Sequence, residues 1–366
     1  MQTLSNQLMY FGFFQSLFLL CVYLFSSKNR KEINGYIAFL IFVLFIGLSG
    51  RVLYTSKVFG DNFRLISLSE FAILMFGATV FLFTRSSLMN KRFSLHDLIH
   101  YLPALFYNLF VVFYFMVPSD TIIVERIKTG ELYRVVSIFV GIGLLINSTY
   151  WALSLRQFFL FRRNLKNELS YSLKTRFFLH FLVAIGGCLF IWIIVYTISL
   201  FQLETLEREA RQFIWLGIAF IIFFIAYHGM VTPDLFHLKS VKFSQKYSQS
   251  KLSGAELGLL KKELEDMMLA KKPYLNNKLM KAELAEMLGI SNPELARLLN
   301  ERIGMNFFDF VNYYRIKEFI ALAETDKAQS LTFFGLAQEA GFNSKTTFNK
   351  SFKNLMGTSP SAYFKK

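Results

Sequence analysis

The sequence LTFFGLAQEAGFNSKTTFNKSFKNLMGTSPSAYFKK at residues 331–366 decides how this chain is interpreted. Residues 331–340 have the composition of a short helix, and Gly341 provides a turn after it. Ser344 is placed to cap a second helix over residues 345–355, because a serine hydroxyl accepts the free N–H groups of a helix start. Helix breakers follow at Gly357, Ser359 and Pro360. Two short helices joined by a glycine turn predict a helix-turn-helix motif.

The same pattern occurs upstream, in KAELAEMLGISNPELARLLNERIG at residues 281–304. A helix over residues 282–288 is expected to end at Gly289. Ser291 and Glu294 have the spacing of a capping box, which predicts the start of the second helix. The expected core positions are Leu284, Leu288, Ile290, Leu295, Leu298 and Leu299. A longer helix over residues 307–324 connects the two motifs.

Two recognition helices on one chain predict a protein that can bind DNA without dimerising. They start 53 residues apart, and such a pair can enter the major groove about one turn, ~34 Å, apart. The residues expected to be mainly exposed on these helices, and so the candidate DNA contacts, are Pro293, Ala296, Arg297, Asn300, Lys345, Thr346, Asn349, Lys350 and Lys353.

Arg297 is the first choice for reading a base, since arginine on guanine is the commonest specific contact, and the alternative is a phosphate contact that does not read sequence. Lys350 and Lys353 are candidates for either base or phosphate contacts. Asn349 is a candidate for pairing with adenine, and the alternative is that it only faces solvent.

Residues 272–366 resemble the tandem helix-turn-helix domain of the AraC family of bacterial transcription regulators. The run AGFNSKTTFNKSFKNLMGTSPSAY follows the family pattern G-F-x-S-x-x-x-F-x-R-x-F-K-x-x-x-G-x-[ST]-P-x-x-[YF], and Arg315 matches the connecting helix. The departures from the pattern are Lys350, Phe319, Pro293 and Ala296. The resemblance implies double-stranded DNA and RNA polymerase as partners. The segment FLFTRSSLMNKRFSLHDLIHYLP at residues 81–103 resembles the multi-pass region of membrane-bound AraC-type regulators of Bacteroidetes.

The residues before Pro233 have a different character. The chain is 366 residues long and 54% apolar, with 44 phenylalanines, and the apolar excess lies in this first part. Crossing a bilayer takes about 20 mostly apolar residues. Seven stretches meet this length, at 7–25, 33–54, 65–83, 98–117, 135–155, 177–201 and 213–231.

The loops between these stretches differ in charge, which predicts their orientation. Loops after the first, third and fifth stretches carry twelve lysines and arginines, and loops after the second, fourth and sixth carry seven. The richer set is expected in the cytoplasm. The N-terminus is then outside and residue 233 onward is inside, where DNA is.

Two charged residues in the apolar part are candidates for signal sensing, because charge within a bilayer is costly and usually functional. Glu70 is expected about two turns into the third stretch, and Arg51 about one turn from the outer end of the second. At matching depth they can pair. The alternatives are a purely structural ion pair, or an arginine that reaches to the membrane surface.

Residues 233–271 are expected to form a linker and an amphipathic helix. Lys239, Lys242, Lys246 and Lys251 suit either anionic lipid or a solvated tether. In residues 255–270 an apolar face of Leu257, Leu260, Leu264 and Met267 predicts a helix. That face either packs on the following domain or forms a homodimer contact.

Together these patterns predict an all-α protein with a seven-helix transmembrane bundle at 1–232, the linker and helix at 233–271, and a cytosolic tandem helix-turn-helix domain at 272–366. The expected function is a one-component regulator of the bacterial cytoplasmic membrane, which couples an unknown small-molecule or membrane signal to transcription. The alternatives are a transporter-like protein fused to a regulatory DNA-binding domain, and a membrane part that serves only as a passive anchor. The sequence has no catalytic dyad, phosphate loop or metal-binding cluster, and its two cysteines, Cys21 and Cys188, are far from any such pattern, so neither an enzyme nor a cofactor is expected.

Overall fold

Helices make up the regular structure of the computed structural model, with one isolated antiparallel bridge among the residues that it describes. Those residues are 2–25, 35–60, 64–67, 69–89, 91, 93–171, 175–201, 204–231 and 253–364. The all-α prediction is confirmed for them. The chain divides into two compact units, residues 1–159 with 175–240, and residues 160–174 with 241–366.

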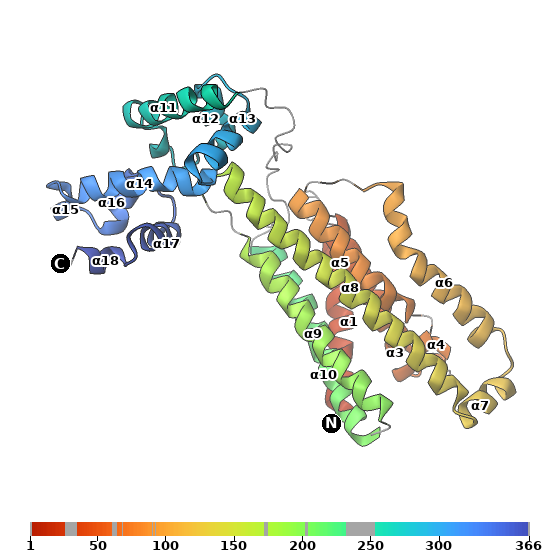
Figure 1. Cartoon of the computed structure of the whole chain (residues 1–366). Helices are drawn as coiled ribbons and strands as arrows, with labels where there is room; N and C mark the ends of the chain where they lie inside the picture. The colour runs from red at the N-terminus through yellow and green to blue at the C-terminus, as the bar shows by residue number, and fades with distance from the viewer. Residues whose placement is uncertain are drawn as a thin grey trace. The chain divides into compact units, whose positions relative to one another are not determined.

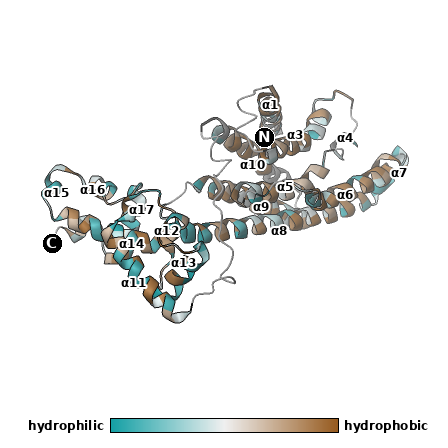
Figure 2. Ribbon diagram, turned by 90° about the horizontal axis from the view of Figure 1, so that it is seen from above, coloured by the Kyte–Doolittle hydropathy of each residue, from teal (hydrophilic) through white to brown (hydrophobic). Residues whose placement is uncertain are grey.

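The first unit is built from long apolar helices (Figure 1). They are α1 (Gln2–Phe25), α3 (Gly35–Thr55), α5 (Phe71–Met89), α6 (Leu102–Val111), α8 (Glu131–Glu168) as far as residue 159, α9 (Arg176–Leu200) and α10 (Glu204–Val231), with short helices α4 (Arg64–Ser67) and α7 (Asp120–Lys128). Helix α3 packs against α1 and α5, and α10 packs against α9 and α1. Figure 2 shows that hydrophobic residues dominate most of the long helices, while α7 and α11–α17 contain both hydrophilic and hydrophobic residues. A unit whose helices are apolar over most of their surface is compatible with membrane insertion.

Six helices are long and apolar enough to cross a membrane, within the described ranges. They are Asn6–Phe25, Gly35–Thr55, Phe71–Met89, Leu95–Met116, Glu131–Glu168 and Arg176–Leu200. The seventh expected stretch contributes a shorter apolar helix, Leu216–His228, within α10. The count of seven spans is therefore not confirmed.

The predicted position of Glu70, two turns inside a helix, is wrong. Helix α5 begins at Phe71, so Glu70 lies in the turn just before it and not two turns inside. The N–H of Ile73 donates to the carbonyl of Glu70 at 3.1 Å, which makes Glu70 part of the helix start. A carboxylate is favoured there, because the N-terminus of a helix carries partial positive charge.

Helix α8 is held to its neighbours by polar groups at points of close approach. The Asn147 amide accepts from the N–H of Gly77 on α5 at 2.8 Å and donates to the carbonyl of Ile73 at 3.0 Å. The Trp151 indole donates to the carbonyl of Leu182 on α9 at 2.7 Å. Small residues make this possible, since a Cβ on Gly77 would lie 2.7 Å from the Asn147 side chain. Such hydrogen bonds tie apolar helices together where a polar group has no other partner.

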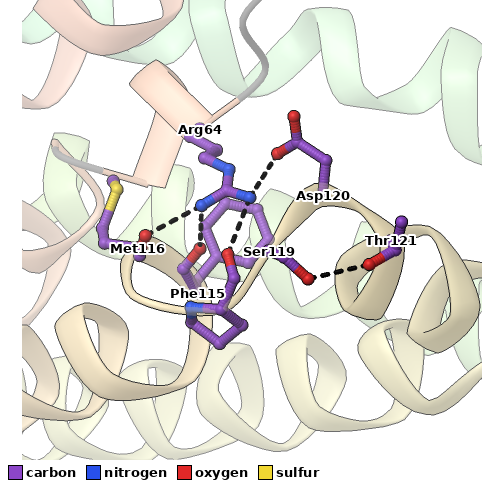
Figure 3. Close-up of polar contacts among 7 residues, drawn as sticks. Arg64, Phe115, Met116, Ser119, Asp120 and Thr121 are labelled. Carbon is purple, nitrogen blue, oxygen red and sulfur yellow. Dashed lines mark hydrogen bonds and ion pairs between the residues drawn. The ribbon is translucent and has the colours of Figure 1, made fainter.

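An arginine closes the chain reversal between α6 and α7 (Figure 3). Arg64 donates to the carbonyls of Phe115, Met116 and Pro118 at 3.1, 2.8 and 3.0 Å and pairs with Asp120. The carbonyls of Phe115 and Met116 end the helical segment Leu102–Met116, whose last turn, Val112–Met116, is wider than an α-helix, and Pro118 follows in the loop. The guanidinium therefore satisfies acceptors that a helix end leaves unpaired.

The second unit contains α11 (Gly254–Ala270), α12 (Lys281–Met287), α13 (Asn292–Leu298), α14 (Phe307–Ala323), α15 (Lys327–Ser330), α16 (Phe333–Glu339), α17 (Lys345–Met356) and α18 (Pro360–Tyr363). Two buried clusters form its core, one around α11–α13 and one around α16–α17, and α14 contributes to both. Helix α11 enters the first cluster through Leu257, Leu264, Met267 and Met268. Its apolar face thus packs on the domain that follows, which agrees with one of the two interpretations of this helix. The four linker lysines lie outside the described residues.

Candidate nucleic-acid interface and cavity

The second helix-turn-helix motif consists of α16, the turn at Gly341 and α17. The hydroxyl of Ser344 accepts from the N–H of Thr347 at 3.4 Å, and Gly357 ends α17 in the left-handed conformation, with φ +74°. Phe348 and Phe352 are buried against Phe319 of α14, with ring centroids 4.6 and 5.7 Å apart. The residues opposite this buried side are all exposed, namely Lys345, Thr346, Asn349, Lys350 and Lys353. Helix α17 therefore presents a basic face without a single acidic residue.

Gly341 is required by the packing of this turn. Its φ is +95°, a conformation that residues with a side chain rarely adopt. A Cβ there would lie 2.2 Å from the carbonyl oxygen of Tyr274 and 3.0 Å from Nε of Arg315. The second turn is thus seated directly on the chain that precedes the first motif.

The first motif has the predicted turn and caps. Gly289 adopts φ +68°, the N–H of Ser291 donates to Glu294 at 2.8 Å, and the N–H of Glu294 donates to Ser291 at 3.4 Å. The predicted core positions are buried, apart from Ile290, which is partly buried. The capping box that the sequence indicated therefore starts α13.

The exposure predicted for the first recognition helix is only partly right. Asn300 is exposed, but Pro293, Ala296 and Arg297 are half-buried. The reason is that α13 is only seven residues long and packs against both α11 and α12. Arg297 is 25% exposed, and its Nε donates to Glu301 at 3.0 Å. This helix thus offers a smaller surface than α17.

Residues 284–366 match a family model described as a helix-turn-helix domain, of the AraC type. This part of the chain is a DNA-binding domain. The match begins within α12 and covers both motifs and the connecting helix α14. Comparison with curated proteins and with solved structures gives no match. The domain supports a role in transcription regulation, and the helices before residue 232 are outside the matched region.

A buried arginine organises this DNA-binding domain, a role that its match to the family pattern did not reveal. Arg315 of α14 is 1% exposed. Its guanidinium donates to the carbonyls of Tyr274, Asn276 and Ser170 at 2.8, 2.7 and 2.7 Å, and to the side chains of Ser170 and Asn312 at 3.1 and 3.2 Å. Burial lowers the pKa of Arg315 to about 10. Each of the three guanidinium nitrogens donates to at least one acceptor. A buried charge needs such hydrogen bonds to replace those it makes with water.

Arg51 and Glu70, the candidates for sensing, both line one cavity of the first unit. The cavity measures about 440 Å³ and is walled by α3, α5, α8, α9 and α10. The phenol of Tyr107 donates to the carboxylate of Glu70 at 3.0 Å. The structure thus brings the two predicted residues to the same space.

The polar residues of this cavity gather at one end. Arg51 lies one turn before the end of α3, Glu70 precedes the start of α5, Tyr133 and Ser137 lie in the first two turns of α8, and Tyr196 and Ser199 lie in the last two turns of α9. Deeper positions are apolar, including Leu44, Phe76, Ile185 and Ile221. A cavity of this size is typical of small-molecule sites. No cluster of three or more His, Cys, Asp or Glu residues suited to a metal ion occurs in the part of the chain that the structure describes.

Proposed function

We propose that this protein is a membrane-bound transcription regulator, in which the apolar helices bind a signal and the AraC-type domain binds operator DNA. The observation that carries the proposal is the joining, in one chain, of six helices long enough to cross a bilayer and a helix-turn-helix domain. DNA lies in the cytoplasm of a bacterium, so the second unit must face it. The charge difference between the loops supports the same orientation.

Thiol labelling of whole cells tests the orientation. The positions need exposed side chains, which Val58, Phe93 and Leu259 have, at 64%, 53% and 74% exposure. In a background with Cys21→Ser and Cys188→Ser, a membrane-impermeant reagent should modify Val58→Cys in intact cells. Phe93→Cys and Leu259→Cys should react only after the cells are opened. Labelling of Leu259→Cys in intact cells would refute the orientation, and recovery of the chain in the soluble fraction would refute membrane insertion.

The cavity indicates the chemistry of the signal. An apolar space with polar groups at one end fits an amphiphile, a molecule with an apolar body and a polar head. Arg51 brings a guanidinium with five N–H donors to that end, and a guanidinium forms strong bonds to carboxylates. We therefore propose an anionic amphiphile, with its head at Arg51 and its body among the deeper apolar side chains.

Equilibrium binding to the full chain in lipid nanodiscs tests this proposal, with decanoate as probe and decanol and decylamine as head-group controls. Wild type should prefer decanoate. Arg51→Gln should weaken decanoate by roughly tenfold, the size of a lost charged hydrogen bond, and leave decanol unchanged. Equal binding of all three probes to wild type would contradict the proposal that the ligand has an anionic head at Arg51. Uptake of decanoate into sealed vesicles would instead favour the transporter alternative.

A transcriptional reporter tests whether Arg51 and Glu70 control output. If they act together, Arg51→Gln and Glu70→Gln should shift expression in the same direction, and the double variant should resemble either single one. Protein abundance must be measured alongside. A lower abundance with unchanged output per molecule would assign the two residues a structural role only.

A further inference from the structure

Residues 166–170, at the end of α8 and just after it, lie inside the DNA-binding unit. They belong to the second unit, although α8 and α9 on either side lie largely in the first. Leu169 forms an antiparallel bridge with Met280 and is 1% exposed. The N–H and the hydroxyl of Ser170 donate to the carbonyl of Leu279 at 3.3 and 2.7 Å. We call residues 166–170 the docking segment.

The docking segment reaches the first recognition helix through a buried carboxylate. Glu168 pairs with Lys281 of α12 at 2.8 Å, and the two side chains are only 9% and 2% exposed. The other oxygen of Glu168 accepts from the amide of Asn292 at 3.3 Å. Asn292 is the first residue of α13. One carboxylate from the end of α8 thus holds both helices of the first motif.

The docking segment also reaches the junction of the two motifs. Ser170 supplies two of the acceptors of Arg315, through its carbonyl and its hydroxyl. Arg315 in turn fixes the carbonyls of Tyr274 and Asn276 and lies against the turn at Gly341. Withdrawal of the segment would remove acceptors from two buried cations, Lys281 and Arg315. Buried charges that lose their partners are strongly destabilising, so both motifs depend on this contact.

We propose that the docking segment is the element through which α8 and α9 control DNA binding, and that its seated form is the one competent to bind. The segment is covalently continuous with α8, and α9 begins six residues after it, at Arg176. A movement of either helix therefore acts on Glu168 and Ser170 directly. This inference rests on the proposed role of the DNA-binding domain in transcription, and it does not depend on the cavity or its ligand.

A disulfide lock combined with a displaced helix tests the proposal in the full chain, in detergent micelles and without any added ligand. The lock is Leu169→Cys with Met280→Cys, in the Cys21→Ser and Cys188→Ser background. Residues opposite each other in an antiparallel bridge are close enough for such a bond. One alanine inserted between Phe158 and Phe159 turns the end of α8 by about 100° relative to the preceding helix. The DNA is a duplex selected from a random pool by the wild-type chain.

The insertion should weaken binding of the selected duplex by at least about tenfold in the reduced protein, a usual size for coupling between sites. Oxidation should return the affinity to within about threefold of wild type, because the lock reseats the segment. Two results would overturn the proposal: an insertion that leaves the affinity unchanged, or an oxidised protein as weak as the reduced one. Failure of the disulfide to form in the chain without the insertion would also overturn it, since Leu169 and Met280 would then not be neighbours.

Side-chain replacements distinguish positioning from simple folding. Glu168→Gln should weaken the selected duplex more than a random duplex, because it loosens α13 but leaves the basic face of α17 intact. Glu168→Met with Lys281→Met should bind better than either single variant, because an apolar pair of similar volume often replaces a buried ion pair without loss. An equal loss on both duplexes would indicate a general folding defect and contradict a positioning role for Glu168.

Discussion

The two helix-turn-helix motifs of this chain share a plan and differ in what holds them. In the second, α17 has twelve residues and an exposed basic face, while its turn at Gly341 is packed against Tyr274 and Arg315. In the first, α13 has seven residues, and its turn at Gly289 faces open space. The start of α13 is instead held by Glu168, from the end of α8. The end of α8 thus contacts the start of α13 directly, whereas it reaches the turn before α17 only through Ser170 and Arg315.

This difference suggests a division of labour. A basic face on a firmly packed helix suits contacts with phosphate, which provide affinity for any sequence. A short helix whose start is held directly by the docking segment suits selective, controlled contacts. We therefore expect α17 to carry most of the affinity and α13 to carry the regulated selectivity.

The largest difference between the motifs should appear at their turn glycines. Gly341→Ala places a Cβ 2.2 Å from a backbone oxygen and strains a residue with φ +95°. We expect it to destabilise the second unit by about 4 kcal/mol, from overpacking and backbone strain together. Gly289→Ala, the matched control, has φ +68° but nothing within 4 Å, so strain alone should cost about 1 kcal/mol.

Pulse proteolysis of the full chain in urea, followed through a C-terminal tag, measures both variants. Equal losses of stability would show that the contact between Gly341 and Tyr274 does not matter. The two turns would then be equivalent, and the proposed fixing of α17 within the domain would be lost.

The affinity of α17 should depend strongly on salt. Replacing Lys345, Lys350 and Lys353 together with alanine should lower the slope of log affinity against log salt by roughly 2–3, since each phosphate contact contributes about 0.9. The loss should be similar for selected and random duplexes. Lys262→Ala on α11, also exposed, serves as the control. A loss confined to the selected duplex would assign these lysines to base reading and reverse the division of labour.

Arg297 of α13 should affect selectivity more than salt dependence. Arg297→Ala is expected to cost about 1–3 kcal/mol on the selected duplex and to relax the preference at one base position. Binding to each single-base variant of the selected duplex measures this. An unchanged affinity and preference would show that Arg297 does not read a base. Arg297 is only 25% exposed and is bonded to Glu301, so this outcome is a direct test of its assigned role.

Local signals made much of this interface predictable. The serines that cap α13 and α17, the turn glycines and the exposed side of α17 each follow from residues within a few positions of one another. Glu70 was misplaced because an apolar stretch does not mark the residue at which a helix starts. The docking segment could not be predicted in this way, because Glu168 and Lys281 are 113 positions apart. The sequence does contain one weak indication that Glu168 has a partner, since it is the single acidic residue in the basic stretch 156–176.

The smallest expected effect belongs to the partner of Arg297. Glu301 is 54% exposed and pairs with Arg297 four residues earlier, and such pairs contribute only about 0.3–0.5 kcal/mol. Glu301→Gln should therefore leave stability almost unchanged. It should tighten binding of the selected duplex by about twofold, because a carboxylate that would repel the DNA phosphates is removed and the Arg297–Glu301 bond is lost. Glu324→Gln, at the far end of α14 and also exposed, is the control and should not change binding. Weaker binding by Glu301→Gln would mean that the pair holds Arg297 in its reading position, and α13 would then be set by its own ion pair as well as by Glu168.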